Sequence, residues 1–290
     1  MGYIKPKEVT PEMLSQATFP NHGSTYTVIR HKFLIDASRS LLKTHGFNIL
    51  NEAYSATTNL NVAQGTYWIE SNKDPELGMM FAWSNSYDKS TRFQCGIGAY
   101  VLVCGNGMVS GDLASYARKH TGNADSEAFN HIMSQIKHAD KYFNKLILDK
   151  DELKKVCLNK KEQSELAGRL FMDENLIDAT QMSCIKNEMN KPTYEYEADL
   201  ENAWTFYNHV THSLKKSHPR SWMSNQQKFH EFMTSELLSQ SKLQVTDANV
   251  IDDVDPSQLN IIDEIENSTF NYSPSHEDEE DIEMFNEFKI

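Results

Sequence analysis

The chain has 290 residues, enough for one large domain or two small ones, and 39% of them are apolar. No apolar run approaches the roughly 20 residues of a membrane helix, and the N-terminal residues lack the apolar core of an export signal. These features argue against a membrane-spanning or exported protein, and we expect a cytoplasmic location.

The net charge of −13 is confined to one part of the sequence. Residues 243–290 contain fourteen acidic residues and one basic residue, Lys289, and therefore carry the whole imbalance. Residues 1–242 contain 27 acidic and 27 basic residues, so their neutral balance is compatible with a surface that binds a polyanion. A like-charged segment with few packing residues repels itself, and we expect 243–290 to be a disordered acidic tail.

The first half of the sequence predicts a sheet. Residues 1–24 hold three prolines and little periodicity, which indicates an extended lead-in. A strand at 25–31 precedes a helix at 32–46, which ends at Gly46. Four further strands are predicted at 47–58, 62–71, 77–86 and 92–104. This β-α-β-β-β-β order favours a mostly antiparallel sheet with a helix on one face.

The second half is predicted to be helical. A short helix at 112–120 begins at Asp112 and ends in basic residues, and residues 125–149 carry apolar side chains at helical spacing. Further helices are predicted at 160–172, 178–190, 197–216 and 224–240. We therefore expect a single α+β domain over 25–242, with a sheet part at 25–111 and a helical part at 112–242.

Two short patterns resemble cofactor or catalytic motifs, and both are incomplete. The glycine run at 105–111 follows a predicted strand, but its G-x-G-x-x-x-G spacing is one residue longer than a dinucleotide-binding turn and Asp112 would repel a phosphate. Ser86 and Lys89 match the S-x-x-K pattern of serine acyl-enzymes, but they lie in a predicted hairpin turn without the companion motifs S-D-N and K-T-G. We expect the glycine run to be the turn at the end of a strand, and the Ser86–Lys89 segment to be a hairpin turn.

Histidines and cysteines offer weak metal patterns. His209 and His212 lie three residues apart on a predicted helix, and His131 and His138 lie seven apart, so each pair could share a helix face. No H-E-x-x-H motif is present and nearby carboxylates are scattered. The cysteines contain no C-x-x-C pair and are expected to be reduced thiols: Cys95, Cys104, Cys157 and Cys184. We therefore expect neither a metal nor another cofactor.

A combination of cations and aromatic rings points to nucleic acid. Cations that meet phosphates, together with rings that stack on bases, are typical of single-stranded nucleic-acid binding. The candidate phosphate contacts are Lys89, Arg92, Arg118, Lys119 and His120, and the candidate stacking residues are Tyr87 and Phe93. The alternative is a solvated face above core aromatics.

The acidic tail bears on this hypothesis. Residues 276–290 mix dense acid with a few apolar side chains, as the tails of many single-stranded-DNA-binding proteins do. Such a tail can occupy a basic groove in place of nucleic acid, or dock on a replication or recombination protein. The candidate partner-binding residues are Ile282, Met284, Phe285 and Phe288. A solubilising tail without a partner is the alternative.

An ordered series of motifs resembles a known family. The series comprises an N-S-x-D-K-S turn, a G-x-x-V-x-V-C-x-N strand exit, an R-K-H-T helix end and a W-x-x-x-N-x-x-T segment. The matching residues are Asn85, Ser86, Asp88, Lys89 and Ser90; Gly98, Val101, Val103, Cys104 and Asn106; Arg118 to Thr121; and Trp204, Asn208 and Thr211. Over roughly residues 20–235 the chain is similar to the phage/plasmid-like protein family, domain of unknown function 932.

The resemblance implies a setting rather than a reaction. The family is carried by phages and plasmids and has no established activity, which implies replication, recombination or host take-over, in the host cytoplasm if the protein is phage-encoded. Its sheet followed by helices is loosely similar to single-strand annealing proteins. We therefore expect a single-stranded-DNA-binding protein. Two alternative functions stay open: a host-interaction or inhibitor protein that uses the acidic tail as a DNA mimic or docking segment, and an enzyme. The oligomeric state also stays open, and a homo-oligomer is possible.

Overall fold

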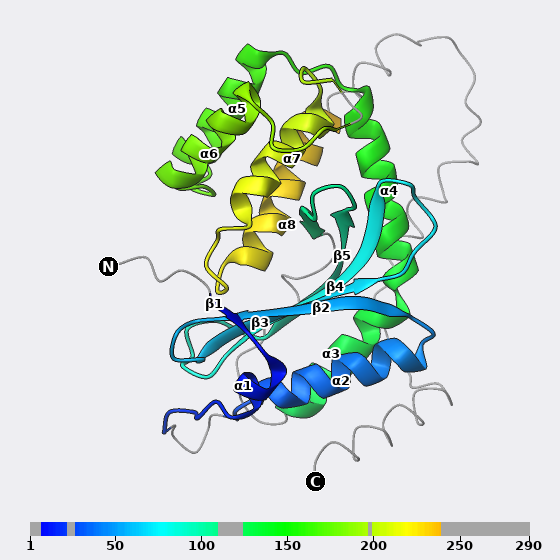
Figure 1. The fold of residues 1–290 in the computed structure, drawn as a ribbon, viewed down its shortest axis with the longest axis vertical. Helices are drawn as coiled ribbons and strands as arrows, with labels where there is room; N and C mark the ends of the chain where they lie inside the picture. The colour runs from blue at the N-terminus through cyan, green and yellow to red at the C-terminus, as the bar shows by residue number, and fades with distance from the viewer. Residues whose placement is uncertain (1–6, 22–26, 110–123, 197–198, 239–290) are drawn as a thin grey trace, which may run out of the picture. The chain divides into compact units, whose positions relative to one another are not determined.

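The computed structural model describes residues 7–21, 27–109, 124–196 and 199–238, all within one compact unit, Met1–Leu238. Its centre is a six-stranded antiparallel sheet in the order β1-β2-β3-β4-β5-β6, in which each strand pairs with the next along the chain (Figure 1). The strands are β1 Lys7–Val9, β2 Ile49–Ala56, β3 Val62–Ile69, β4 Leu77–Ser86, β5 Gln94–Val101 and β6 Gly107–Val109.

The helices lie mostly in the second half of the chain, which confirms the predicted α+β class. Two precede β2: α1 Pro11–Ser15 and α2 His31–Thr44. The others are α3 Ala124–Lys137, α4 Ala139–Lys155, α5 Lys160–Met172, α6 Ala179–Asn190, α7 Ala203–Leu214 and α8 Trp222–Met233, which continues as a π-helical turn over Thr234–Leu238.

Local sequence signals explain where several helices begin and end. Asn159 and Asp178 each form a capping box with the residue three positions later, Glu162 and Gln181 respectively. The side chain of the capping residue accepts the backbone N–H of that later residue, whose side chain accepts the backbone N–H of the capping residue. These boxes start α5 and α6. Gly46, at φ 79°, follows α2 in the left-handed conformation that glycine adopts without strain.

The two faces of the sheet pack against different helices. On one face, Tyr54, Tyr67 and Trp83 form a cluster of ring contacts that reaches His31 of α2. On the other face, β4 residues Met80 and Ala82 pack against Trp222 and Met223 of α8. In Figure 1, α2 and α3 lie beneath the sheet and α7 and α8 above it. The strand β4 is buried along its whole length because both faces are covered.

The predicted strand at 25–31 is not found in its described part. Residues 27–30 have no regular structure and His31 begins α2. Two side chains from the end of β4 supply the missing partners: Asn85 Nδ2 donates to the carbonyl of Ile29 at 2.8 Å, and the Tyr87 hydroxyl accepts the N–H of His31 at 2.7 Å. Because these long-range partners replace a sheet neighbour, strand-forming residues alone misled the prediction.

Other boundaries also differ from the prediction. The lead-in contains β1 and α1, whose first turn is capped by the Thr10 hydroxyl. The helix predicted at 125–149 is two helices, α3 and α4, separated at His138. The strand predicted to reach 104 ends at Val101, so Val103 is 55% exposed instead of lying in a buried strand. The predicted helix at 112–120 lies outside the described residues.

Candidate functional site

The turn between β4 and β5 is held together by its own polar side chains. The Ser86 hydroxyl donates to the carbonyl of Thr91 at 2.8 Å and accepts its N–H at 3.1 Å, and the Asp88 carboxylate accepts the N–H of Ser90 at 3.0 Å. Lys89 has φ 63°, a left-handed conformation that is not compatible with the helical turn of a Ser-x-x-Lys nucleophile pair. This part of the motif series therefore builds a hairpin.

Tyr87 and Phe93 belong to the core. Tyr87 is 2% exposed, and its ring lies nearly parallel to that of His31 with 3.9 Å between the centroids. Burial raises the pKa of the Tyr87 hydroxyl. Phe93 is also 2% exposed and meets the ring of His131 edge-on. The structure corrects the expectation that these rings lie on the surface, because apolar contacts at the base of the turn hold both of them inside.

Lys89 and Arg92 are exposed, and a second basic segment docks beside them. The loop 215–220, of sequence KKSHPR, joins α7 to α8. The carbonyl of Pro219 accepts the Ser84 hydroxyl at 3.3 Å, and the Arg220 guanidinium lies 3.9 Å from the Asp88 carboxylate. We call Lys89, Arg92 and Arg220 the basic surface.

Seven further site residues were expected from the sequence. Arg118, Lys119 and His120 lie outside the described residues, and so do the tail residues Ile282, Met284, Phe285 and Phe288. Arg220 was not selected from the sequence, although the density of cations in 215–220 was a readable signal. What the sequence did not reveal is that this loop folds back onto a hairpin more than a hundred residues earlier.

Two of the family-like motifs meet in the core. Asn106 donates from its amide to the carbonyl of Asn208 at 3.0 Å and to that residue's side-chain oxygen at 3.3 Å. The N–H of Asn106 also donates to the sulfur of Cys104 at 3.4 Å. Burial raises the pKa of the Cys104 thiol, which disfavours a thiolate nucleophile. These residues join the end of β5 to α7, and the glycine run at 105–111 forms the short strand β6 in its described part.

Polar side chains of α6 and α7 form a further buried group. Glu188 accepts the N–H of Thr193 at 3.0 Å and its hydroxyl at 2.5 Å, and these bonds lower the pKa of Glu188 although burial opposes them. Burial lowers the pKa of His209 to about 4 and also lowers the pKa of His212. Among the described residues, no group of three or more His, Cys, Asp or Glu side chains is arranged to hold a metal ion.

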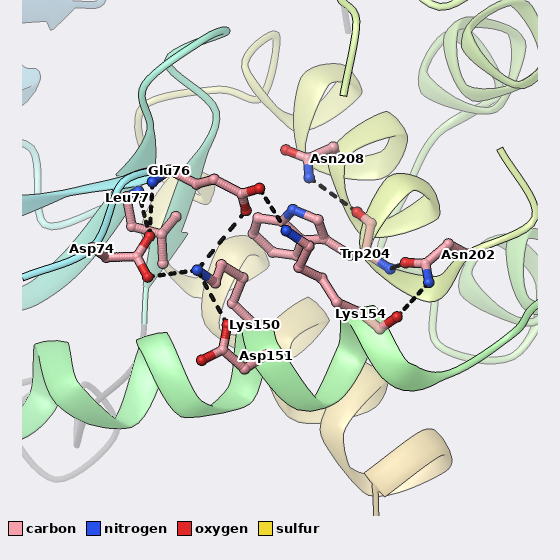
Figure 2. Close-up of polar contacts among 9 residues, drawn as sticks. All are labelled: Asp74, Glu76, Leu77, Lys150, Asp151, Lys154, Asn202, Trp204 and Asn208. Atoms are coloured by element: carbon pink, nitrogen blue, oxygen red, sulfur yellow. Dashed lines mark hydrogen bonds and ion pairs between the residues drawn. The ribbon is translucent and has the colours of Figure 1, made fainter. Parts of the chain in front are cut away.

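Figure 2 shows an ion cluster around the buried Lys150–Asp74 pair, which fastens α4 to the end of the loop before β4. The Lys150 ammonium lies 2.5 Å from Asp74 and 3.2 Å from Asp151, and Lys154 lies 2.6 Å from Glu76. The second oxygen of Asp74 accepts the N–H groups of Glu76 and Leu77, each at 2.9 Å. Each charge has an opposite partner, so we assign this cluster a structural role.

A pocket of about 320 Å³ lies on the sheet face opposite α2, beneath the start of the basic loop. Cross-strand pairing places Ser55, Gln64 and Ser84 side by side on this face, and Ser55 and Gln64 line the pocket. Within the described part of the chain, Ser55 Oγ and Gln64 Oε1 are buried without a hydrogen-bond partner. Further lining residues are Glu8, Thr66, Trp68, Met80, Lys215, Ser217 and Trp222.

The lining combines aromatic rings with balanced charge. Trp68 is partly exposed, whereas Trp222 is 8% exposed and packs against Met80 and Ala82. Lys215 donates to the carbonyl of Cys104, which fixes its ammonium at the wall, and burial lowers its pKa. Glu8 of the edge strand supplies one carboxylate, so the pocket can hold a neutral planar group between polar and aromatic walls.

The fold and this site define an α+β protein with one antiparallel sheet, a pocket on one sheet face and a basic surface at the neighbouring hairpin. The family model "Domain of unknown function (DUF932)" matches residues 21–236, and the chain therefore belongs to that family. This confirms the resemblance to domain of unknown function 932 that the motif series indicated. No match was found among the curated proteins or among the solved structures. Within the described residues, no helix has the length and apolar character needed to cross a bilayer.

Proposed function

We propose that the protein binds single-stranded nucleic acid, in the first place single-stranded DNA, during replication or recombination. The observation that supports the proposal is the docking of the 215–220 loop on the β4–β5 turn, which brings Arg220 to the hairpin that carries the exposed Lys89 and Arg92. Clustered cations attract a phosphate backbone because their binding releases condensed counterions. The phage and plasmid setting implied by the family resemblance would supply such strands.

The charge balance supports the same proposal. The acidic excess of the sequence lies in residues 243–290, and the remaining residues are neutral overall. In the proposed function, the tail competes with nucleic acid for the basic surface or recruits a replication or recombination protein. Arg118, Lys119 and His120 would extend the phosphate contacts. A tail that only solubilises the protein would leave binding unchanged when it is removed.

A salt-titrated binding assay tests the proposal. The full chain and a chain that ends at Lys242 are titrated against a fluorescent oligothymidylate of about 20 nucleotides, long enough for a typical single-strand site. We expect both to bind at low salt, with affinity falling linearly on a logarithmic salt scale, and the shortened chain to bind more tightly. Undetectable binding by the shortened chain at low salt would refute the proposal.

A duplex of the same sequence serves as the matched control. If the strand is held by unstacked bases as well as phosphates, the single strand should bind more tightly than the duplex at equal salt. Equal affinities would indicate a purely electrostatic, non-specific interaction.

A further inference from the structure

We propose that the pocket on the sheet face captures one nucleobase of the bound strand, with Trp68 as the stacking surface and Ser55 and Gln64 as the groups that meet the base edge. The inference rests on the proposed function, and it replaces Tyr87 and Phe93 as the stacking residues because both are buried. Four features of the pocket support it.

The first feature is the aromatic wall. Trp68 is only partly buried, and the ring of Tyr100 meets it edge-on with 6.3 Å between the centroids. Tyr100 lies across Gly78 of the neighbouring strand, where a Cβ atom would come within 2.2 Å of its ring. This packing holds Trp68 from the side and leaves a partly exposed indole in the pocket, and any base can stack on such a surface.

The second feature is the pair of unsatisfied polar atoms. Ser55 and Gln64 are directly opposite each other on β2 and β3, so their side chains lie about 5 Å apart at Cβ. Ser55 Oγ can donate and Gln64 Oε1 can accept, and a pyrimidine edge presents a carbonyl beside an N–H. Both atoms are shielded from water in the free protein, so small side-chain movements must accompany entry of the base. An unpaired buried polar group is costly, and pairing with a base removes that cost.

The third feature is charge. Glu8 and Lys215 both line the pocket, so its formal charges cancel. A phosphate gains little electrostatic binding energy in a pocket whose charges cancel, and it would lose its hydration. An uncharged heterocycle does not carry the desolvation cost of an ion. The pocket therefore suits the base of a nucleotide, and the phosphate of that nucleotide stays outside the pocket. A volume of about 320 Å³ is sufficient for one base and part of its sugar.

The fourth feature is continuity with the basic surface. Lys215 lines the pocket and Arg220 contacts the β4–β5 turn, and the two are five positions apart in one loop. An extended chain of five residues spans at most about 17 Å. A strand that follows the loop from Arg220 therefore passes the pocket mouth within a few nucleotides. Phosphate contacts and base capture would thus act on the same strand.

The test compares wild type with variants of the pocket against two oligonucleotides, using the full chain. Wild type, Trp68→Ala and Gln64→Ala are titrated with an oligothymidylate of about 20 nucleotides and with an abasic strand of equal length, which keeps the phosphates and lacks the bases. We expect wild type to bind thymidylate about tenfold or more tightly than the abasic strand. Trp68→Ala should lose this preference and keep its affinity for the abasic strand, and Trp68→Phe should restore it in part.

Gln64→Ala separates a ligand role from a structural one. Because Gln64 Oε1 has no partner within the described residues, its removal should weaken thymidylate binding several-fold without lowering the urea midpoint of unfolding. Gln94→Ala is the matched control: Gln94 pairs with Ser84 in the same polar row but does not line the pocket, so thymidylate affinity should not change. Equal effects of the two substitutions on binding would overturn the inference.

A titration with free thymidine monophosphate shows whether the pocket takes a base from a strand or from a free nucleotide. It also separates failure of the pocket inference from failure of the proposed function. If the oligonucleotides bind but wild type shows no thymidylate preference and Trp68→Ala has no effect, the pocket inference is overturned and the proposed function stands. If neither oligonucleotide binds but thymidine monophosphate binds in a Trp68-dependent manner, the proposed function fails and the pocket is a site for free nucleotides. If nothing binds, both are overturned.

Discussion

At the scale of single residues, the pocket wall depends on a glycine. A Cβ atom at Gly78 would lie 2.2 Å from the ring of Tyr100, the side chain that supports Trp68. We predict that Gly78→Ala lowers the free energy of unfolding by about 1–3 kcal/mol, because the ring must move in a packed layer. Urea unfolding monitored by circular dichroism measures the change.

Gly168 in α5 is the matched control for that substitution. No atom lies within 4 Å of the position a Cβ would take there, apart from the helix's own backbone, so Gly168→Ala adds helix propensity without a clash. It should raise the free energy of unfolding by about 0.5–1 kcal/mol. Destabilisation by both substitutions to the same extent would contradict the assignment of the Gly78 effect to Tyr100.

The residue His209 gives a pH prediction. Burial lowers its pKa from about 6.5 to about 4, so the unfolded chain binds a proton between these values that the folded protein does not. The stabilising contribution is complete above pH 6.5 and is lost as the pH falls toward 4, by roughly 2–3 kcal/mol over that window. Urea unfolding at pH 7 and pH 5 should show a smaller difference for His209→Gln than for wild type. An unchanged difference would show that another group is responsible.

At the scale of elements, α4 is fixed to the sheet by a buried cation. The Lys150 side chain is 4% exposed, and three carboxylates lie within 4 Å of its ammonium. We predict that Lys150→Met lowers the free energy of unfolding by about 3 kcal/mol, because the Asp74 carboxylate stays buried without its cation.

A lysine on the same helix supplies the comparison. Lys155 pairs with Glu152, and both side chains are more than half exposed, so Lys155→Met should change the free energy of unfolding by about 0.5 kcal/mol or less. Chemical unfolding of both variants under the same conditions tests the pair. Equal and small effects would show that the Lys150 cluster is not stabilising.

The elements also show what the sequence could and could not predict. The strand β4 and the helix α5 were predicted with the bounds found, because a continuous apolar run and a capping residue are local signals. The segment before α2 was predicted as a strand, and only long-range bonds from Asn85 and Tyr87 explain its actual form. Predictions from local pattern were incorrect where distant side chains supply the backbone partners.

At the scale of the whole molecule, the same distinction applies to the site. The exposed Lys89 and Arg92 were selected from the sequence because they lie in a polar turn. Arg220 and the pocket residues were not selected, because only the fold brings the 215–220 loop over the sheet. Tyr87 and Phe93 were placed on the surface because aromatic residues beside cations carry no signal of which way they point. The sequence thus indicated two exposed cations of the hairpin, whereas Arg220 and the pocket required the fold.

The salt dependence of single-strand binding tests the central claim most directly. Each phosphate contact contributes about −0.7 to the slope of log K against log salt, so replacing Lys89, Arg92 and Arg220 with Gln should reduce the slope by about 2 and weaken binding at low salt. Lys141, Lys145 and Lys160 are exposed cations on α4 and α5, and replacing these three with Gln is the matched control. The account predicts a shallower slope for the first triple variant alone. The same slope for wild type and both triple variants would contradict it.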